Sequence, residues 1–183
     1  PSSRKRALLG HSHPRIVEAV RRQIGELDRL FSGMLSAPVV GLAEALDMLF
    51  EEGLEAVFSR HARLARATRE AVSAWGLENL AVLPAEYSNS LTAVVMPEGH
   101  DADELRRVIL ERFDMALGTG LGKVRGKVFR IGHLGHFNDL MLMGALCGVE
   151  MGLKLAGVPH NEGGANAAMR ILSEQRRVMH SSM

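Results

Sequence analysis

An arginine lies within an otherwise apolar segment, where packing alone does not explain it. The segment reads KVFRIGHLG, with Arg130 between the strand-forming residues Phe129 and Ile131. Because side chains alternate between the faces of a strand, Arg130 shares a face with Val128, and Gly132 places it near a strand end. Such a guanidinium has three physical options: it reaches water, pairs with an internal carboxylate, or binds an anion from outside.

Internal partners for this charge exist in the sequence. Glu150 and Asp139 both belong to the apolar helix expected to follow the strand. A guanidinium fork also matches the two oxygens of a ligand carboxylate, so an external partner would be a small carboxylate. The residues alone leave these alternatives open.

Other polar motifs give weaker signals. The glycine-rich stretch GTGLGKVRG, residues 118–126, lacks a complete phosphate-loop or dinucleotide-binding pattern, which favours a flexible hairpin loop. Histidines recur as the pair His11 and His13 and as the pair His133 and His136. Neither pair has the third ligand that a zinc site needs, so the spacing does not predict one.

Composition is that of a soluble globular chain. The 183 residues are 46% hydrophobic and 23% charged, with 22 basic against 21 acidic residues, which gives no basic face for nucleic acid. The single cysteine, Cys147, rules out an internal disulfide, and its apolar neighbours predict a packing role. The most apolar stretch, residues 140–149, is too short to cross a membrane. We therefore expect a cytoplasmic protein.

The periodicity changes along the chain from helical to strand-like and back. Asp101 and Asn138 are expected helix caps, and Gly53 and Gly76 an expected break and stop. The glycines at 144, 148 and 152 form a smooth stripe that predicts close packing on a sheet. Helices are expected over about residues 14–27, 42–75, 101–113, 138–155 and 165–178, and strands over 79–83, 90–96 and both sides of the 118–126 loop.

This order of elements predicts an α+β domain with a small, mostly antiparallel sheet packed with helices. From about residue 46 to 172 the chain resembles the C-terminal small domain of serine–glyoxylate and alanine–glyoxylate aminotransferases, class V enzymes that depend on pyridoxal phosphate (PLP). The resemblance rests on segments such as SLTAVVMPEGHDADELRRVILERF, GTGLGKVRGKVFRIGHLG and MGALCGVEMGLKLAGVPH. In that family the arginine of the FRIG motif binds the substrate α-carboxylate. The resemblance therefore implies that Arg130 binds an amino acid or 2-keto acid.

The N-terminal part is similar to a different family. Within residues 8–43, LLGHSHPRIVEAV and LDRLFSGMLSAPVVGLA resemble dialkylglycine decarboxylases, which are class III PLP enzymes. The resemblance implies an alkali-metal half-site made by the carbonyl of Leu30 and the hydroxyl of Ser32. It also implies two parts, a helical segment 1–43 and a small domain 44–183, without the large cofactor domain that both families have.

The four lysines bear on that cofactor. They are Lys5, Lys123, Lys127 and Lys154, and none stands in a sequence context like the Schiff-base lysine of these families. We therefore expect that the chain does not bind PLP and does not transaminate by itself. Alternative hypotheses are a separate chain that supplies the lysine domain, and a non-catalytic module that forms a homo-oligomer or binds a partner chain.

Overall fold

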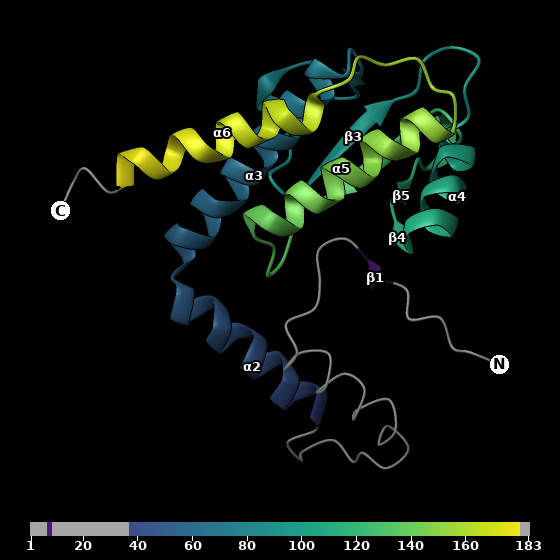
Figure 1. Cartoon of the computed structure of the whole chain (residues 1–183). Coiled ribbons are helices and arrows are strands. Elements are labelled where there is room, and N and C mark those ends of the chain that lie inside the picture. Colours follow the sequence, from purple (N-terminus) through teal and green to yellow (C-terminus); the bar gives the residue numbers. More distant parts are fainter. Residues whose placement is uncertain (1–6, 9–36, 180–183) are drawn as a thin grey trace. The chain divides into compact units, whose positions relative to one another are not determined.

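The computed structural model describes the backbone of residues 7–8 and 37–179, and side-chain burial for residues 41, 42 and 44–173. The chain divides into two units: Ser12–Arg60, whose described residues are helical (the helical unit), and Pro1–His11 with His61–Met183, which contains the sheet (the sheet unit). Figure 1 shows the described helices and strands. The helix expected near Pro14 and the metal half-site of Leu30 and Ser32 lie outside the described residues.

The described part of the helical unit is built around a helix break. Helix α2 (Ala37–Glu52) ends before Gly53, and α3 (Leu54–Ala74) begins after it. Gly53 has a φ of +84°, a conformation that costs glycine little, so the expected break is confirmed. Arg60 donates hydrogen bonds of 2.6 and 2.7 Å to the two carboxylate oxygens of Glu52, which joins α3 to the end of α2.

The sheet unit contains a four-stranded antiparallel sheet, which confirms the sequence prediction. Its strand order is β2-β3-β6-β5, and a separate parallel pair is formed by β1 and β4. The two central strands are in register from Leu91 opposite Gly132 to Val95 opposite Val128. The strands are β1 (Ala7–Leu8), β2 (Glu78–Asn79), β3 (Leu91–Val95), β4 (Met115–Ala116), β5 (Gly118–Thr119) and β6 (Val128–Gly132).

One predicted strand is much shorter than expected. The segment NLAVL was expected to be extended, but β2 ends at Asn79 and a 3₁₀ turn, η2, occupies Pro84–Glu86. Only Leu80 prolongs the pairing, through its N–H bond of 2.9 Å to the carbonyl of Ala93. Val82 is 80% exposed, so no burial holds these apolar residues in the sheet.

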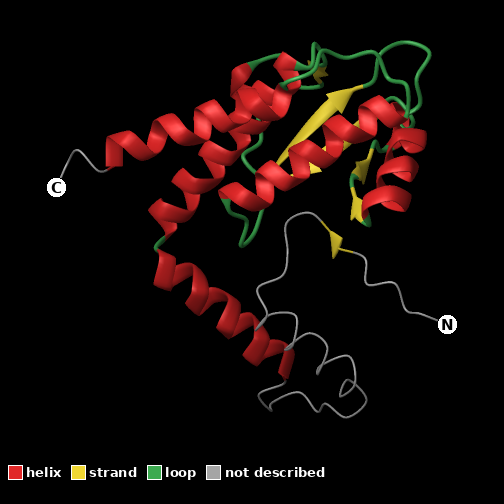
Figure 2. Ribbon diagram, in the orientation of Figure 1, coloured by secondary structure: helices red, strands yellow, loops and turns green. Residues whose placement is uncertain are grey.

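Four helices contribute to the core of the sheet unit. Figure 2 shows α5 running alongside the strands, and Leu142 and Leu146 of α5 cluster with Phe129 of β6. The expected caps are confirmed: the Asp101 side chain accepts from the N–H of Asp103, and the Asn138 side chain from that of Met141. Besides α3, the helices are α4 (Ala102–Phe113), α5 (Asp139–Leu155) and α6 (Gly164–Met179).

The glycine stripe on α5 packs differently from the prediction. A Cβ at Gly152 would lie 2.2 Å from Cγ1 of Ile109 on helix α4, so this close contact is made with a helix. Gly148 faces Met115 of β4, and Gly144 has nothing within 4 Å. Within the described residues, no helix combines the length and the apolar character that crossing a bilayer would require.

Candidate functional site

Arg130 lies on the face of the sheet opposite the core. Its neighbours in β6, Phe129 and Ile131, are fully buried core residues, as the strand periodicity predicts. Across the sheet, Arg130 is opposite Ala93 on β3 and opposite Gly118 on β5. The arginine is therefore flanked on both sides by the smallest residue types.

The guanidinium of Arg130 has no protein partner among the residues that the structure describes. Among these residues, its Nε is buried without a hydrogen bond, and no ion pair reaches the side chain. Nη1 and Nη2 also lack a hydrogen bond but are not among the buried unpaired atoms, so these two nitrogens are accessible. An unpaired buried N–H costs free energy that a bound acceptor would recover.

The two internal carboxylates considered as partners are engaged elsewhere. Asp139 forms a bidentate pair with Arg63, with Nη–O distances of 2.5 and 2.9 Å. Glu150 accepts from the indole N–H of Trp75 and from the backbone N–H groups of Gly163 and Ala165 at the start of α6. An internal salt bridge to either is thus wrong as an account of Arg130.

Glu150 acts instead as the cap of helix α6. Burial raises its carboxyl pKa, but the hydrogen bonds from Gly163, Ala165 and Trp75 outweigh that effect and leave the pKa below its usual value. An ionised carboxylate at a helix N-terminus is favourable, because the free N–H groups there carry partial positive charge.

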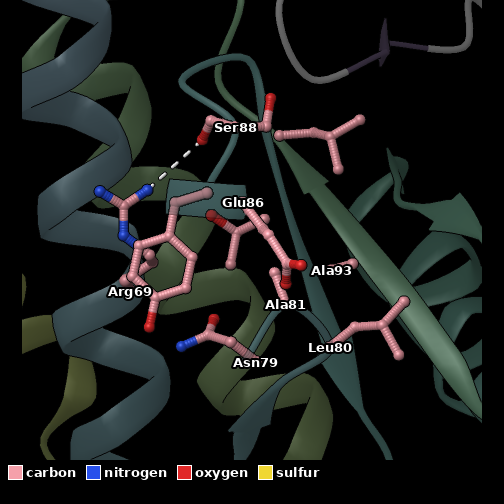
Figure 3. Close-up of a pocket in the computed structure, with 10 residues that line it drawn as sticks. Arg69, Asn79, Leu80, Ala81, Glu86, Ser88 and Ala93 are labelled. Atoms are coloured by element: carbon pink, nitrogen blue, oxygen red, sulfur yellow. Dashed lines mark hydrogen bonds between the residues drawn. The ribbon is translucent and has the colours of Figure 1, made fainter. Parts of the chain in front are cut away.

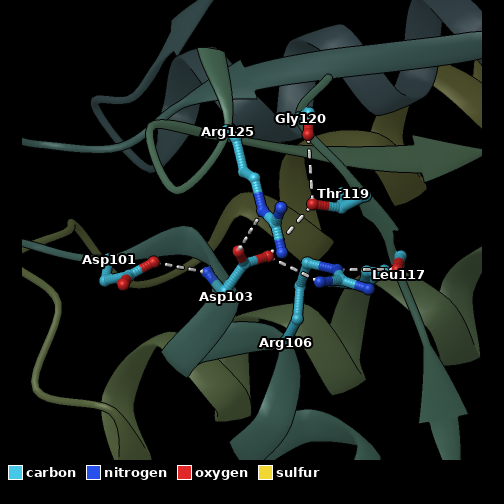
Figure 4. Close-up of polar contacts among 7 residues, drawn as sticks. All are labelled: Asp101, Asp103, Arg106, Leu117, Thr119, Gly120 and Arg125. Atoms are coloured by element: carbon cyan, nitrogen blue, oxygen red, sulfur yellow. Dashed lines mark hydrogen bonds and ion pairs between the residues drawn. The ribbon is translucent and has the colours of Figure 1, made fainter. Parts of the chain in front are cut away.

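A polar network holds the strand next to Arg130 (Figure 4). Asp103 of α4 accepts from Arg106 Nη1 at 2.6 Å and from the Thr119 hydroxyl at 3.0 Å. Arg106 Nε donates to the carbonyl of Leu117 at 2.9 Å. The bonds from Arg106 and then Thr119 lower the pKa of Asp103. Helix α4 is thus hydrogen-bonded to Leu117 and Thr119, the residues on either side of Gly118.

His133, just after β6, is fully buried and paired within the protein. Its Nδ1 lies 3.1 Å from the carbonyl of Asn89, which can only accept, so Nδ1 carries the proton and Nε2 accepts from the Thr92 hydroxyl at 3.0 Å. Burial lowers its pKa to about 4. Both ring nitrogens are therefore used, and no cluster of three potential metal ligands occurs among the described residues.

The glycine-rich stretch 118–126 forms the β5–β6 hairpin, as predicted. It contains a 3₁₀ turn, η3, at Gly122–Val124. A Cβ at Gly120 would lie 2.2 Å from the carbonyl oxygen of Val124, so the loop closes tightly on its own backbone.

A cavity of about 270 Å³ lies between α3 and the β2 edge (Figure 3), and sequence reasoning did not identify it. The guanidinium of Arg69 lies 4.6 Å from the ring centre of Tyr87, and Nη1 is 3.4 Å from the carbonyl of Ser88. Burial lowers the pKa of Arg69, with an opposing effect of Tyr87. The lining residues all lie within residues 69–93, but they come from a helix, a 3₁₀ turn and two strands, and no local motif predicts how these elements pack.

A second cavity, of about 370 Å³, is lined by Cys147, Lys154 and Glu162 among others. Cys147 is exposed, so the predicted packing role is wrong. Its side chain faces solvent, although its neighbours in the sequence on α5, Leu146 and Gly148, are both buried. Lys154 bonds Glu162 at 2.7 Å, which raises the lysine pKa.

The described lysines do not fit a PLP site. A Schiff-base lysine is helped by a lowered pKa, whereas that of Lys154 is raised and its side chain is 73% exposed. Lys123 and Lys127 are exposed on the hairpin. Lys5, His11 and His13 lie outside the described residues.

Comparisons with known proteins agree with the fold. No family model matches the chain. It is 53% identical over 128 residues to serine–glyoxylate aminotransferase of Arabidopsis thaliana, covering 70% of this chain and 32% of that protein. It is 42% identical over 178 residues to L-aspartate–glyoxylate aminotransferase of Paracoccus denitrificans, covering 88% and 44%. The chain thus spans about a third to under half the length of these relatives.

Among solved structures, pyridoxamine–pyruvate aminotransferase from Mesorhizobium loti matches with a TM-score of 0.74 and 33% identity, over 81% of this chain and 38% of that one. The fold is the α+β fold found in PLP-dependent aminotransferases. The relatives are aminotransferases of the serine–glyoxylate and aspartate–glyoxylate type, which supports the resemblance of residues 46–172. The dialkylglycine decarboxylase resemblance of residues 8–43 stays a prediction.

Proposed function

We propose that this chain supplies the substrate-binding small domain of an aminotransferase of the serine–glyoxylate or alanine–glyoxylate type, with Arg130 as the anchor for the α-carboxylate of an amino acid or 2-keto acid. The observation that carries the proposal is the Arg130 guanidinium, which has no partner among the described residues, with a buried Nε and accessible terminal nitrogens on the face of the sheet opposite the core. Two parallel N–H···O bonds from these nitrogens would fix both the position and the orientation of the ligand.

The lysine and the phosphate-binding groups of the reaction then come from outside residues 1–183. They belong to a longer chain or to a separate one, and residues 1–183 alone bind and orient a carboxylate without transaminating.

Titration with L-serine and glyoxylate tests the anchor, with L-serinamide as the ligand that lacks only the carboxylate. We expect the backbone amide resonances of Ala93, Gly118 and Arg130 to shift with the two carboxylates and not with the amide. Arg130→Gln should weaken binding at least about tenfold, because charge-assisted bonds contribute about 1.5–3 kcal/mol. Arg112→Gln is the matched control, since Arg112 is exposed on α4. Equal binding by both variants would refute the anchor.

The alkali-metal half-site at Leu30 and Ser32 is a further part of the proposal. It rests on the resemblance of residues 8–43 to dialkylglycine decarboxylases. Ser32→Ala should remove any difference in thermal stability between potassium and sodium solutions at equal ionic strength. A chain that melts identically in both salts before substitution has no such site.

Self-association is a second candidate function. Several large apolar side chains of the sheet unit are more than half exposed, and such exposure favours a partner surface. We expect a defined homo-oligomer by size-exclusion chromatography with light scattering, and a monomer at all concentrations would contradict this. These side chains are Val82, Leu83, Leu121, Leu134 and Leu140.

A further inference from the structure

Gly118 lies directly under the side chain of Arg130. The two residues are opposite one another in the β5–β6 pair, so their side-chain positions share the face of the sheet opposite the core. A Cβ built at Gly118 would lie 3.0 Å from Cβ of Arg130 and 3.1 Å from its Nε. Both distances are shorter than ordinary van der Waals contact, so the stem of the arginine occupies the space that any other residue would need.

The two nearest atoms belong to the side chain of Arg130, and of these only Nε can move away without a shift of the backbone. The third atom near the same Cβ is the carbonyl oxygen of Arg130, at an ordinary 3.5 Å. Gly118 also lacks a positive φ, so its backbone conformation is open to other residues. A methyl group at this position would therefore push the guanidinium away, and at the Cβ contact it would also shift β5 and β6 relative to each other by a few tenths of an ångström.

Helix α4 fixes the strand that carries this glycine (Figure 4). Arg106 holds the carbonyl of Leu117, and Asp103 holds the hydroxyl of Thr119. Arg106 and Asp103 are themselves joined by a 2.6 Å bond. Both neighbours of Gly118 are thus hydrogen-bonded to one helix, which fixes the position of β5 beside Arg130.

We propose that Gly118 is a positioning residue for substrate binding: its missing side chain seats the Nε of Arg130 against β5, so that the carboxylate is received end-on by Nη1 and Nη2. The inference rests on the proposed function of Arg130. It goes beyond it by assigning the geometry of the anchor to a residue that never touches the ligand. With Nε buried against Gly118, only the two terminal nitrogens are accessible to an oxygen pair.

The test compares two glycine-to-alanine variants of the full chain. Gly118→Ala inserts a methyl group under Arg130, whereas Gly144→Ala adds one where nothing lies within 4 Å. The first readout is the Nε–Hε NMR resonance of Arg130 without ligand, which should be slow to exchange in the native chain. The second is the dissociation constant for glyoxylate, again with L-serinamide as the ligand without a carboxylate.

We expect Gly118→Ala to move the Arg130 resonance toward that of exposed arginines and to weaken glyoxylate binding at least about tenfold, because a small misplacement of the fork breaks its paired geometry. Gly144→Ala should change neither. An unaltered resonance and affinity in folded Gly118→Ala would overturn the proposal.

Thr119→Val provides the test if Gly118→Ala does not fold. It removes the hydrogen bond from Thr119 to Asp103 and leaves Arg130 unchanged. We expect faster exchange of the Arg130 Hε and about threefold weaker glyoxylate binding, because β5 is then held less firmly. An unchanged Arg130 signal would again count against the role of β5. If the native chain binds no carboxylate, the proposed function fails, while the resonance without ligand still decides whether Gly118 seats the guanidinium.

Discussion

His133 shows how a single buried residue sets a pH limit on the fold. Its folded pKa is lowered to about 4 mainly by burial, from the 6.5 of a free imidazole. Between these values the unfolded chain binds a proton that the folded chain does not. The contribution of the neutral His133 to the free energy of unfolding is therefore complete above pH 6.5, and it is lost as the pH falls from 6.5 to about 4.

We expect the free energy of unfolding to drop by about 2 kcal/mol between pH 7 and pH 5 from this residue alone. Urea unfolding at the two pH values measures the drop, and His133→Gln should make the pH dependence flatter by that amount. An NMR titration of the ring that gave a midpoint at or above 6.5 would show that His133 is not held neutral.

At this scale the sequence predicted the position of Arg130 and missed the pairing of His133. The alternation of Phe129, Arg130 and Ile131 is local, so the strand periodicity was sufficient. Thr92 lies 41 residues from His133 in the chain, and only the β3–β6 register brings the two together. No spacing rule within one segment contains that information.

Helices α4 and α5 are fitted together at one glycine. Gly152→Ala would place a methyl group 2.2 Å from Cγ1 of Ile109, which is fully buried and has no room to move away. We expect a loss of about 1–3 kcal/mol in the free energy of unfolding, because overpacking forces side chains or backbone to shift. Denaturant titration measures this loss.

The matched control is again Gly144→Ala on the same helix. It has no contact to disturb and gains helix propensity, so it should stabilise the chain by about 0.5–1 kcal/mol. Similar effects of the two substitutions would mean that helix propensity, and not the α4 contact, decides the outcome.

Element boundaries were predictable where a local residue sets them. Asp101 and Asn138 accept the hydrogen bonds that start α4 and α5, and Gly76, with a φ of +74°, follows the end of α3. The segment 80–83 was predicted wrongly, since its apolar residues suit a strand but find no buried face. Whether an apolar residue is buried depends on distant elements, which the local pattern does not specify.

The whole molecule is expected to lack a cofactor lysine within residues 1–183. Incubation with PLP, borohydride reduction and intact mass analysis should give no stoichiometric adduct, because Lys123 and Lys127 are exposed on the hairpin and Lys154, although it lines the second cavity, has its pKa raised by Glu162 and so stays protonated. Partial modification spread over several lysines would agree with this. One fully modified lysine would identify a cofactor site and contradict the proposal that the Schiff-base lysine comes from outside residues 1–183.

The burial of Trp75 has an optical consequence. This only tryptophan of the chain has no exposed surface, donates its indole N–H to Glu150 on α5, and leaves no space for a Cβ on Gly164 at the start of α6. Intrinsic fluorescence therefore reports on a single junction, where the chain after α3 meets α5 and α6. Its emission should be blue-shifted while that junction is closed and should shift to the red when α6 detaches. A ligand that binds at Arg130 without loosening α6 should therefore leave this emission unchanged.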